Sequence, residues 1–424
     1  MYNYTNFIVS IIVLYFIFRT HGVVQILPGI WLFPLIIIAL FSVNKGLSVK
    51  KKYLKFLIKE SKWIILSVFI LTAYKFFDYG NFKLTNTFSY LITSLPFYVI
   101  GFYYGIKFNK DFIKKITIGY FVFTFFFLIP KIVLVFSTGF NSTLFNLSFV
   151  ADPTNKDFLL FLPFVSFITV YGSIQLLQSK SLLIKILAYI ILLTNILAMF
   201  LSGKAGPIVI LLIAITFYFF KNRSNFIQKY INIIVSTLFI FVLLFGISKG
   251  LFGELGSLKS KSTAVISFIE NGFLINDDVL NRISSDRWSL DIHSIKQFFA
   301  KPIFGHGAYL ESMKGMLGAS ANITTVAGGH SFIFDTMAFY GLFGLPLIFI
   351  LVKFNRDAVK YYYLVKKNNE EHKISLIYAS LLVGVLIANV LNSGFLFSSF
   401  DNFLFLLAGF YLGKYYYISK IKYE

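Results

Sequence analysis

The stretch SFIFDTMAFYGLFGLPLIFILV, residues 331–352, is long and apolar enough to cross a lipid bilayer. A helix needs about 20 mostly apolar residues to span a hydrocarbon core of ~30 Å. One acidic residue, Asp335, interrupts the run, and His330 directly precedes it. Ionisable groups are costly inside a membrane and usually functional there, so a chemical site is expected near the start of this helix. Gly341 and Gly344 are expected to let the helix pack closely against a neighbour.

The composition of the whole chain agrees with a membrane protein. Of its 424 residues, 57% are hydrophobic and only 13% are charged, with a mean hydropathy of +0.77. A soluble domain has about 25% charged residues, so the chain is expected to be integral to a membrane. It has no cysteine, which excludes disulfides, iron–sulfur clusters and thiolate zinc sites.

Twelve apolar runs of suitable length occur along the chain. They lie near 5–18, 24–43, 63–78, 89–106, 116–136, 158–178, 183–201, 206–220, 231–248, 331–352, 374–392 and 399–417. The runs lack the alternation of barrel strands. We therefore expect an all-α, polytopic membrane protein with about twelve transmembrane helices, in which residues 1–424 form a single transmembrane domain.

The charges of the loops predict the orientation. One alternate set of loops and ends holds twenty-five basic residues, including seven lysines in 44–62, whereas the short loops of the opposite set hold four. Positively charged loops stay in the cytoplasm, so both termini are expected there, in a bacterial cytoplasmic membrane. Because topology explains most of the net charge of +21, no binding to nucleic acid is expected.

A long extracytoplasmic loop, residues 249–330, separates the ninth and tenth spans in this arrangement. Long loops in compact proteins are usually functional or disordered. Four apolar residues recur there at helical spacing, and Pro302 is expected to end the helix that they form. The stripe consists of Trp288, Ile292, Ile295 and Phe299. It favours a re-entrant or interfacial amphipathic helix, and a second reading has this helix present Arg287 to an anionic substrate.

Other chemical signatures are weak. The chain has no GxxxxGK[ST] loop for ATP and no HExxH zinc motif. His293, His306 and His330 share the outer side, but they lack ligand spacing and an acidic cluster, so no metal site is predicted. Lys131 follows Pro130 inside an apolar run. Its ammonium group either snorkels to the membrane surface or faces a polar cavity.

Three segments together resemble the O-antigen ligase and polymerase family. The first is LSGKAGPIVI (201–210), an outer turn into the next helix, and the second is DRWSLDIHSIKQFFAKPIFGHG (286–307). The third is GGHSFIFDTMAFYGLFGL (328–345), which is similar to the family's His-Asn helix start and Gly-x-x-Gly. Ser331 stands where asparagine is usual, and either residue can cap the helix. Lys204 stands one position away from an arginine that is common in the family.

The resemblance implies a bundle of the kind called GT-C, which transfers sugars on the outer membrane face without a metal or other cofactor. The donor it implies is a polyprenyl-diphosphate-linked oligosaccharide, and a chain-length regulator and a flippase are the protein partners. Arg287 and His330 are the expected catalytic residues, Arg287 as a clamp on the diphosphate and His330 as the base. The expected substrate-binding residues are Arg282, Lys204, Lys131 and Asp335.

Polymerisation of the repeat units of a bacterial surface polysaccharide, an O-antigen or a capsule, is the preferred function. A ligase that transfers finished glycan to a final acceptor needs the same cations and base, so it stays an alternative. A flippase is an alternative of another class, although nearly charge-free spans and the lack of internal duplication argue against it. Three roles stay open for Asp335: it orients a cation, orients a sugar hydroxyl, or pairs with a polar group of another span.

Overall fold

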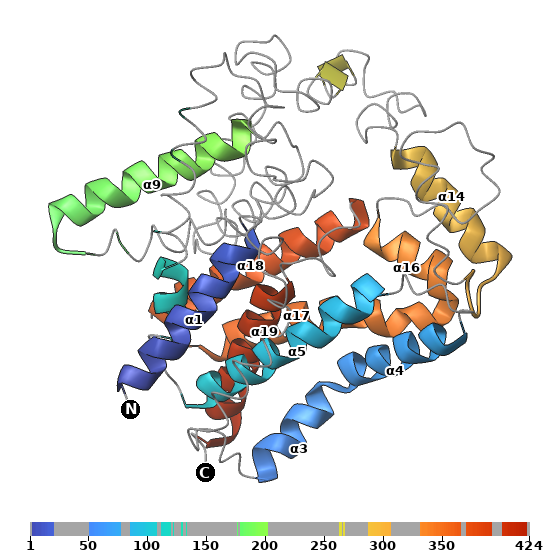
Figure 1. Cartoon of the computed structure of the whole chain (residues 1–424), viewed down its shortest axis with the longest axis horizontal. Coiled ribbons are helices and arrows are strands. Elements are labelled where there is room, and N and C mark those ends of the chain that lie inside the picture. The colour runs from blue at the N-terminus through green and yellow to red at the C-terminus, as the bar shows by residue number, and fades with distance from the viewer. Residues whose placement is uncertain are drawn as a thin grey trace.

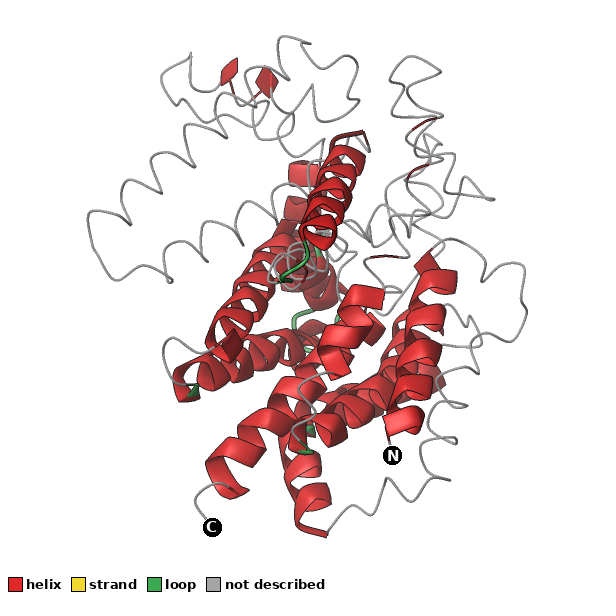
Figure 2. Cartoon of the chain, turned by 90° about the vertical axis from the view of Figure 1, so that its left-hand side faces the viewer, coloured by secondary structure: helices red, strands yellow, loops and turns green. Residues whose placement is uncertain are grey.

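The computed structural model describes residues 2–20, 51–77, 85–107, 112–119, 179–201, 287–306, 331–365, 370–391 and 401–421, with a few isolated positions. In this part of the chain every regular element is helical, as expected. The elements are α1 (Tyr2–Thr20), α3 (Lys51–Glu60), α4 (Lys62–Phe77), α5 (Thr85–Ile106), α9 (Leu182–Leu201), α14 (Arg287–Ala300), α16 (Phe332–Tyr340), η3 (Gly341–Gly344), α17 (Leu345–Leu364), α18 (Glu370–Leu391), α19 (Asp401–Tyr416) and η4 (Tyr417–Ile421). Helices α5, α17, α18 and α19 gather into a central bundle (Figures 1 and 2).

Seven of the twelve predicted spans coincide with described helices. They correspond to α1, α4, α5, α9, α16 with α17, α18, and α19. The other five lie wholly or partly outside the described residues, so the count of twelve stays a prediction. Within the described part, one helical stretch, Phe332–Leu364, is long and apolar enough to cross a membrane, with a mean hydropathy of 2.0 over its apolar 18-residue window. Three shorter apolar helices lie at Asn6–Tyr15, Lys62–Tyr74 and Leu182–Thr194.

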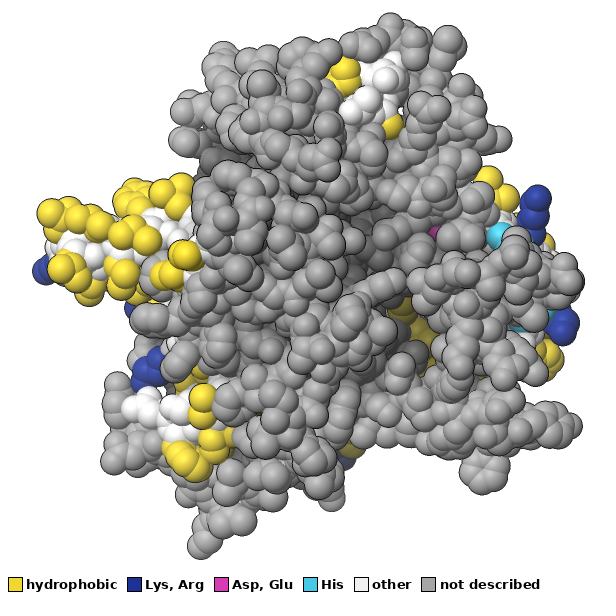
Figure 3. Space-filling view, turned by 45° about the horizontal axis from the view of Figure 1, so that its top comes forward, with side chains coloured by type: hydrophobic (Ala, Val, Ile, Leu, Met, Phe, Trp, Pro, Cys, Tyr) yellow, Lys and Arg dark blue, Asp and Glu magenta, His cyan; other side chains and the backbone are white. Residues whose placement is uncertain are grey.

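Helix α9 exposes apolar side chains along much of its length. The strongly exposed ones are Leu182, Leu183, Ile186, Tyr189 and Leu193. Figure 3 shows hydrophobic side chains covering the projection at the left, on the side where Figure 1 places α9. Extended apolar surfaces are rare on soluble monomers, so this surface is typical of contact with lipid.

Two basic segments expected as loops are partly helical. Residues 51–60 of the segment 44–62 form α3, and α17 continues to Leu364 instead of ending near residue 352. The long apolar helix is also interrupted, because a short 3-10 segment, η3, separates α16 from α17. A Cβ on Gly344 would meet Thr336 of α16, so this glycine lets η3 pack closely on the helix that precedes it.

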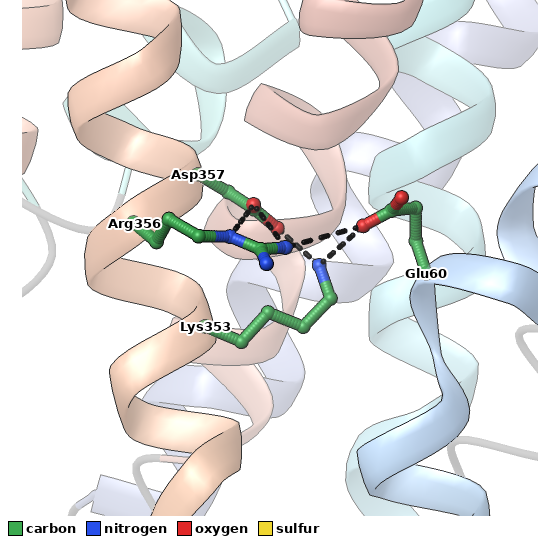
Figure 4. Close-up of polar contacts among 4 residues, drawn as sticks. All are labelled: Glu60, Lys353, Arg356 and Asp357. Atoms are coloured by element: carbon green, nitrogen blue, oxygen red, sulfur yellow. Dashed lines mark hydrogen bonds and ion pairs between the residues drawn. The ribbon is translucent and has the colours of Figure 1, made fainter.

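A charged cluster explains why α17 continues past its apolar part. Lys353 is only 4% exposed, and its ammonium group contacts Asp357 and lies 3.3 Å from Glu60 Oε2. Arg356 lies 3.1 Å from Asp357 Oδ1 and 3.4 Å from Glu60 Oε2. Figure 4 shows the four side chains converging from α17 and from the end of α3. Opposite charges at these distances offset part of the cost of burying a lysine side chain.

Helices α5 and α19 meet along a seam of four glycines. Gly101 and Gly105 of α5 face α19, and Gly409 and Gly413 of α19 face α5. A Cβ on Gly105 would meet the Phe410 carbonyl oxygen, and the other three positions are blocked by backbone in the same way. Two small-xxx-small pairs thus let the helix backbones touch, which is a common packing device in membranes.

A buried amide ties three helices together near this seam. Ser94 Oγ of α5 donates to Asn402 Oδ1 of α19 at 2.9 Å. Asn402 Nδ2 donates in turn to the Tyr15 hydroxyl of α1 at 2.7 Å. All three side chains are fully or almost fully buried. The side chains of Ser94, Asn402 and Tyr15 are thus joined by hydrogen bonds, and these contacts orient α1, α5 and α19 relative to one another.

The glycine seam predicts a sharp difference between two alanine substitutions. Gly105→Ala forces a methyl group against backbone and should lower the free energy of unfolding by about 1–3 kcal/mol. Gly119→Ala is the matched control, because its methyl group meets only the side chain of Val13, at 3.2 Å. Thermal unfolding in detergent should show a lower midpoint for Gly105→Ala alone. Equal midpoints would contradict the close approach of α5 and α19.

Candidate active site

The helix expected in the outer loop is present as α14, which ends at Ala300. It stops two residues before Pro302, whose ring clashes inside an α-helix. The chain then turns through residues 301–306, and the Gly305 N–H donates to the Lys301 carbonyl oxygen at 2.9 Å. The expected end of this helix is confirmed.

The buried side chains of α14 are polar. Asp291 and Ser294 are 6% and 0% exposed, and Asp335 of α16 is 7% exposed. Ser294 Oγ donates a hydrogen bond to Asp335 Oδ1 at 3.0 Å. A buried carboxylate is costly without donors of this kind, so the contact fixes α14 against α16. Pairing with a polar group of another helix was one of the three roles left open for Asp335.

The outward surface of α14 and its turn carries large apolar side chains beside two exposed lysines, Lys296 and Lys301. Phe299 is 73% exposed, and Ile303 and Phe304 in the turn are 54% and 65% exposed. Ile292 and Ile295 are partly buried. A helix facing water has the opposite distribution, with its apolar stripe inside. Polar contacts inside and apolar side chains outside are typical of a helix surrounded by lipid, which favours the re-entrant or interfacial placement.

The turn after α14 docks at the junction of α16 and η3. The His306 N–H donates to the Ala338 carbonyl oxygen at 3.1 Å, and the Leu342 N–H donates to the Pro302 carbonyl oxygen at 2.8 Å. These bonds give partners to backbone groups at the end of α16 that its own helix leaves unpaired. The turn and the helix end are thereby one folded unit.

Two glycines make this docking possible. Gly305 and Gly341 have φ angles of 66° and 58°, which other residues adopt only with strain. A Cβ on Gly341 would meet the carbonyl oxygens of Pro302 and Ile303, and one on Gly305 would meet that of Phe339. Gly341 thus permits a close approach, as expected, but to the turn of the outer loop and not to a neighbouring helix.

A tyrosine from another helix holds the same junction. The Tyr74 hydroxyl of α4 lies 2.5 Å from the Phe304 carbonyl oxygen and 3.1 Å from that of Tyr340, so its proton serves both. The rings of Tyr74 and Tyr340 meet edge-on, with centroids 5.2 Å apart. The sequence analysis missed Tyr74, because nothing marks it among the 26 tyrosines. Ser294 was also missed, although it follows Asp291 by three residues and so shares its helix face.

Helix α16 begins with the expected cap. Ser331 has an extended backbone, and its side chain accepts a hydrogen bond from the Phe334 N–H at 3.3 Å. Serine therefore performs the capping role that asparagine could also perform. The positive end of the helix dipole lies at this cap and favours nearby anions.

Helices α14 and α16 run side by side in the same direction (Figure 1). Ser294 is level with Asp335, and Pro302, further along the chain, is level with Leu342. Arg287 begins α14 seven residues before Ser294, about 10 Å along the helix. The cap of α16 lies four residues before Asp335, about 6 Å along its helix. Both helices therefore start at the same end of the pair.

The expected site residues are described to different extents. Asp335 is fully described, and Arg287 is described as the first residue of α14. The remaining four, His330, Arg282, Lys204 and Lys131, lie outside the described residues. Helix α9 ends at Leu201, where the turn that contains Lys204 is expected to begin.

The histidines of the described outer segment make local contacts. His306 Nε2 donates to the Gln297 carbonyl oxygen at 3.0 Å, and His293 Nε2 lies 3.3 Å from Gln297 Nε2. Among the residues that the structure describes, no group of three or more His, Asp or Glu side chains could hold a metal ion.

The comparison with known proteins finds one family to which part of the chain is similar. Residues 188–350 match the family described as O-antigen ligase. The matched region includes all three segments on which the resemblance rests and extends into α17. No curated protein matches the chain. The match confirms the resemblance to the O-antigen ligase and polymerase family, which is a family of membrane proteins.

The contact between α14 and α16 predicts a specific cross-link. Because the chain has no cysteine, a Ser294→Cys, Asp335→Cys double variant would hold a single pair of thiols. Mild oxidation should join them, and mass spectrometry should recover the linked peptides. Lys296→Cys with Asp335→Cys is the control, because Lys296 is exposed and should not link. Equal linking of the two pairs would contradict the described face of α14.

Proposed function

Because residues 188–350 carry the O-antigen ligase domain, we propose that this chain polymerises lipid-linked oligosaccharide repeat units for a bacterial surface polysaccharide. The donor is a polyprenyl-diphosphate-linked oligosaccharide, and the reaction takes place on the outer face of the cytoplasmic membrane. A chain-length regulator and a flippase are its proposed protein partners. The observation that carries the proposal is the parallel pairing of α14 and α16, which supports a common site for Arg287 and His330.

The chemistry requires a fixed positive charge. The acceptor hydroxyl oxygen bonds to the anomeric carbon of the donor sugar, while the bond from that carbon to the phosphate oxygen breaks. The polyprenyl diphosphate leaves with the electron pair, so negative charge grows on its oxygens. An arginine binds such oxygens in two parallel hydrogen bonds and needs no metal. Arg287 is assigned this role, and the secondary cations are Arg282, Lys204 and Lys131.

The same reaction requires a base. The acceptor hydroxyl must lose its proton as it attacks, and histidine takes up protons near neutral pH. His330 is assigned this role. It directly precedes the cap residue Ser331, whose contact with Phe334 fixes the start of α16. The helix end at this cap also favours the diphosphate, because its free N–H groups and dipole attract anions.

Asp335 acts in this scheme as a positioning residue. Its carboxylate lies between the two helices and accepts a hydrogen bond from Ser294, so it fixes the distance between their starting ends. A displacement of about 1 Å between reacting groups can lower a rate a hundredfold. The same carboxylate is also proposed to contact the sugar.

Single alanine substitutions in the native host test this function. Arg287→Ala and His330→Ala should each lower the amount of long polysaccharide about 100-fold or more. Single lipid-linked repeats should then persist on the outer leaflet, where gel analysis of surface glycan and extraction of the lipid-linked pool would detect them. Lys180→Ala and His372→Ala are the controls, since these residues lie on other elements.

Three other outcomes are possible, and each has its own meaning. Polymer of normal length and amount in both variants would contradict the assigned site. Polymer of normal length that is no longer transferred to its final acceptor would indicate a ligase. Repeats trapped on the inner leaflet would indicate a flippase.

A further inference from the structure

Helix α3 leads directly into α4 at Ser61. Aromatic rings attach α3 to the bundle. The Ser61 N–H donates to the Leu57 carbonyl oxygen at 2.8 Å, and the Ile65 N–H donates to the Ser61 carbonyl oxygen at 2.9 Å. The helical hydrogen bonding thus continues almost without interruption from α3 into α4. On the inner face, Phe56 packs on Tyr416 with ring centroids 4.5 Å apart. This side of α3 is occupied by the protein itself.

A second face of α3 carries a stripe of lysines. Lys52, Lys55 and Lys59 of α3 and Lys62, the first residue of α4, are all exposed. Their spacing of three, four and three residues places them on one side of the nearly continuous helix. The one acidic residue of α3, Glu60, lies outside this stripe. It contacts Lys353 and Arg356 of α17 (Figure 4). The lysine stripe is therefore not neutralised by its own helix.

A third face, next to the lysines, is apolar and also exposed. Leu54 and Ile58 are 49% and 52% exposed, and the line continues on α4 with Ile65 and Phe69, which are 50% and 70% exposed. Four-residue steps within each helix keep these side chains on one line. The apolar face of α3 is thus continuous with the surface that the apolar helix α4 would turn to lipid.

We propose that α3 is a binding surface for anionic phospholipid headgroups. Its apolar line would enter the boundary between headgroups and acyl chains, and its lysines would reach the phosphate layer, as in other interfacial helices. Polybasic segments beside a span attract anionic lipids in this way. An acidic protein would match the lysines alone, whereas a lipid matches both the lysines and the exposed apolar line beside them.

The absence of cysteine provides a direct experiment. Ile58→Cys gives a single labelling site on the exposed apolar line, which can carry a fluorophore in the full chain reconstituted in bilayers. Brominated lipids quench fluorophores within contact distance. With equal amounts of both lipid classes, brominated phosphatidylglycerol should quench about fivefold more effectively than brominated phosphatidylcholine. High salt should reduce this preference, because it screens exposed charges.

Two charge-matched variants complete the test. Lys55→Gln with Lys59→Gln should abolish the preference for the anionic lipid and keep quenching by both lipids. Lys180→Gln with Lys360→Gln removes the same charge from other exposed positions and should leave the preference unchanged. Equal quenching by the two lipids in the Ile58→Cys protein that keeps all its lysines would overturn the proposal. Quenching by neither lipid would also overturn it and would indicate a face that is covered by protein or water.

Discussion

The pairing of α14 with α16 depends on one buried carboxylate, Asp335, held between the two parallel helices. A charged group at that depth is costly unless donors surround it. Ser294 Oγ is one such donor, at 3.0 Å. A buried hydrogen bond therefore joins α14 to the apolar helix α16, which lies about forty residues further along the chain.

Several weaker constraints support that contact from the other end of the helix pair. The turn 301–306 lies so close to Gly341 that a side chain there would collide with its backbone. Tyr74 reaches the same place from α4 and binds carbonyl oxygens on both sides of the junction. Behind it, the glycine seam of α5 and α19 and the charged cluster around Lys353 fix the bundle.

Much of this architecture could be predicted from the sequence, because lipid leaves few choices. Apolar runs without alternation indicate helices, and seven of them coincide with described helices. The end of α14 before Pro302 and the cap at Ser331 follow from local chemistry, and both are observed. The resemblance carried by three short segments is confirmed by the family match over residues 188–350.

The contacts between distant segments could not be predicted in the same way. The apolar stripe predicted α14, but it did not indicate that the polar residues Asp291 and Ser294 would be the buried ones. The stripe gives the period of a helix but does not say which medium surrounds it. Gly341 correctly predicted a close approach, but the sequence did not indicate which segment would approach it. Tyr74 and Lys353 gained their roles from partners 230 and 293 residues away, which local patterns do not encode.

We propose that one chain joins lipid-linked repeat units to each other without a metal. The most direct test uses the purified chain in liposomes, with EDTA and a single substrate, the polyprenyl-diphosphate-linked repeat unit. We predict polymer that grows in steps of one repeat, with one polyprenyl diphosphate released for each bond formed. An unchanged substrate, or product formed only after a divalent metal is restored, would contradict the account.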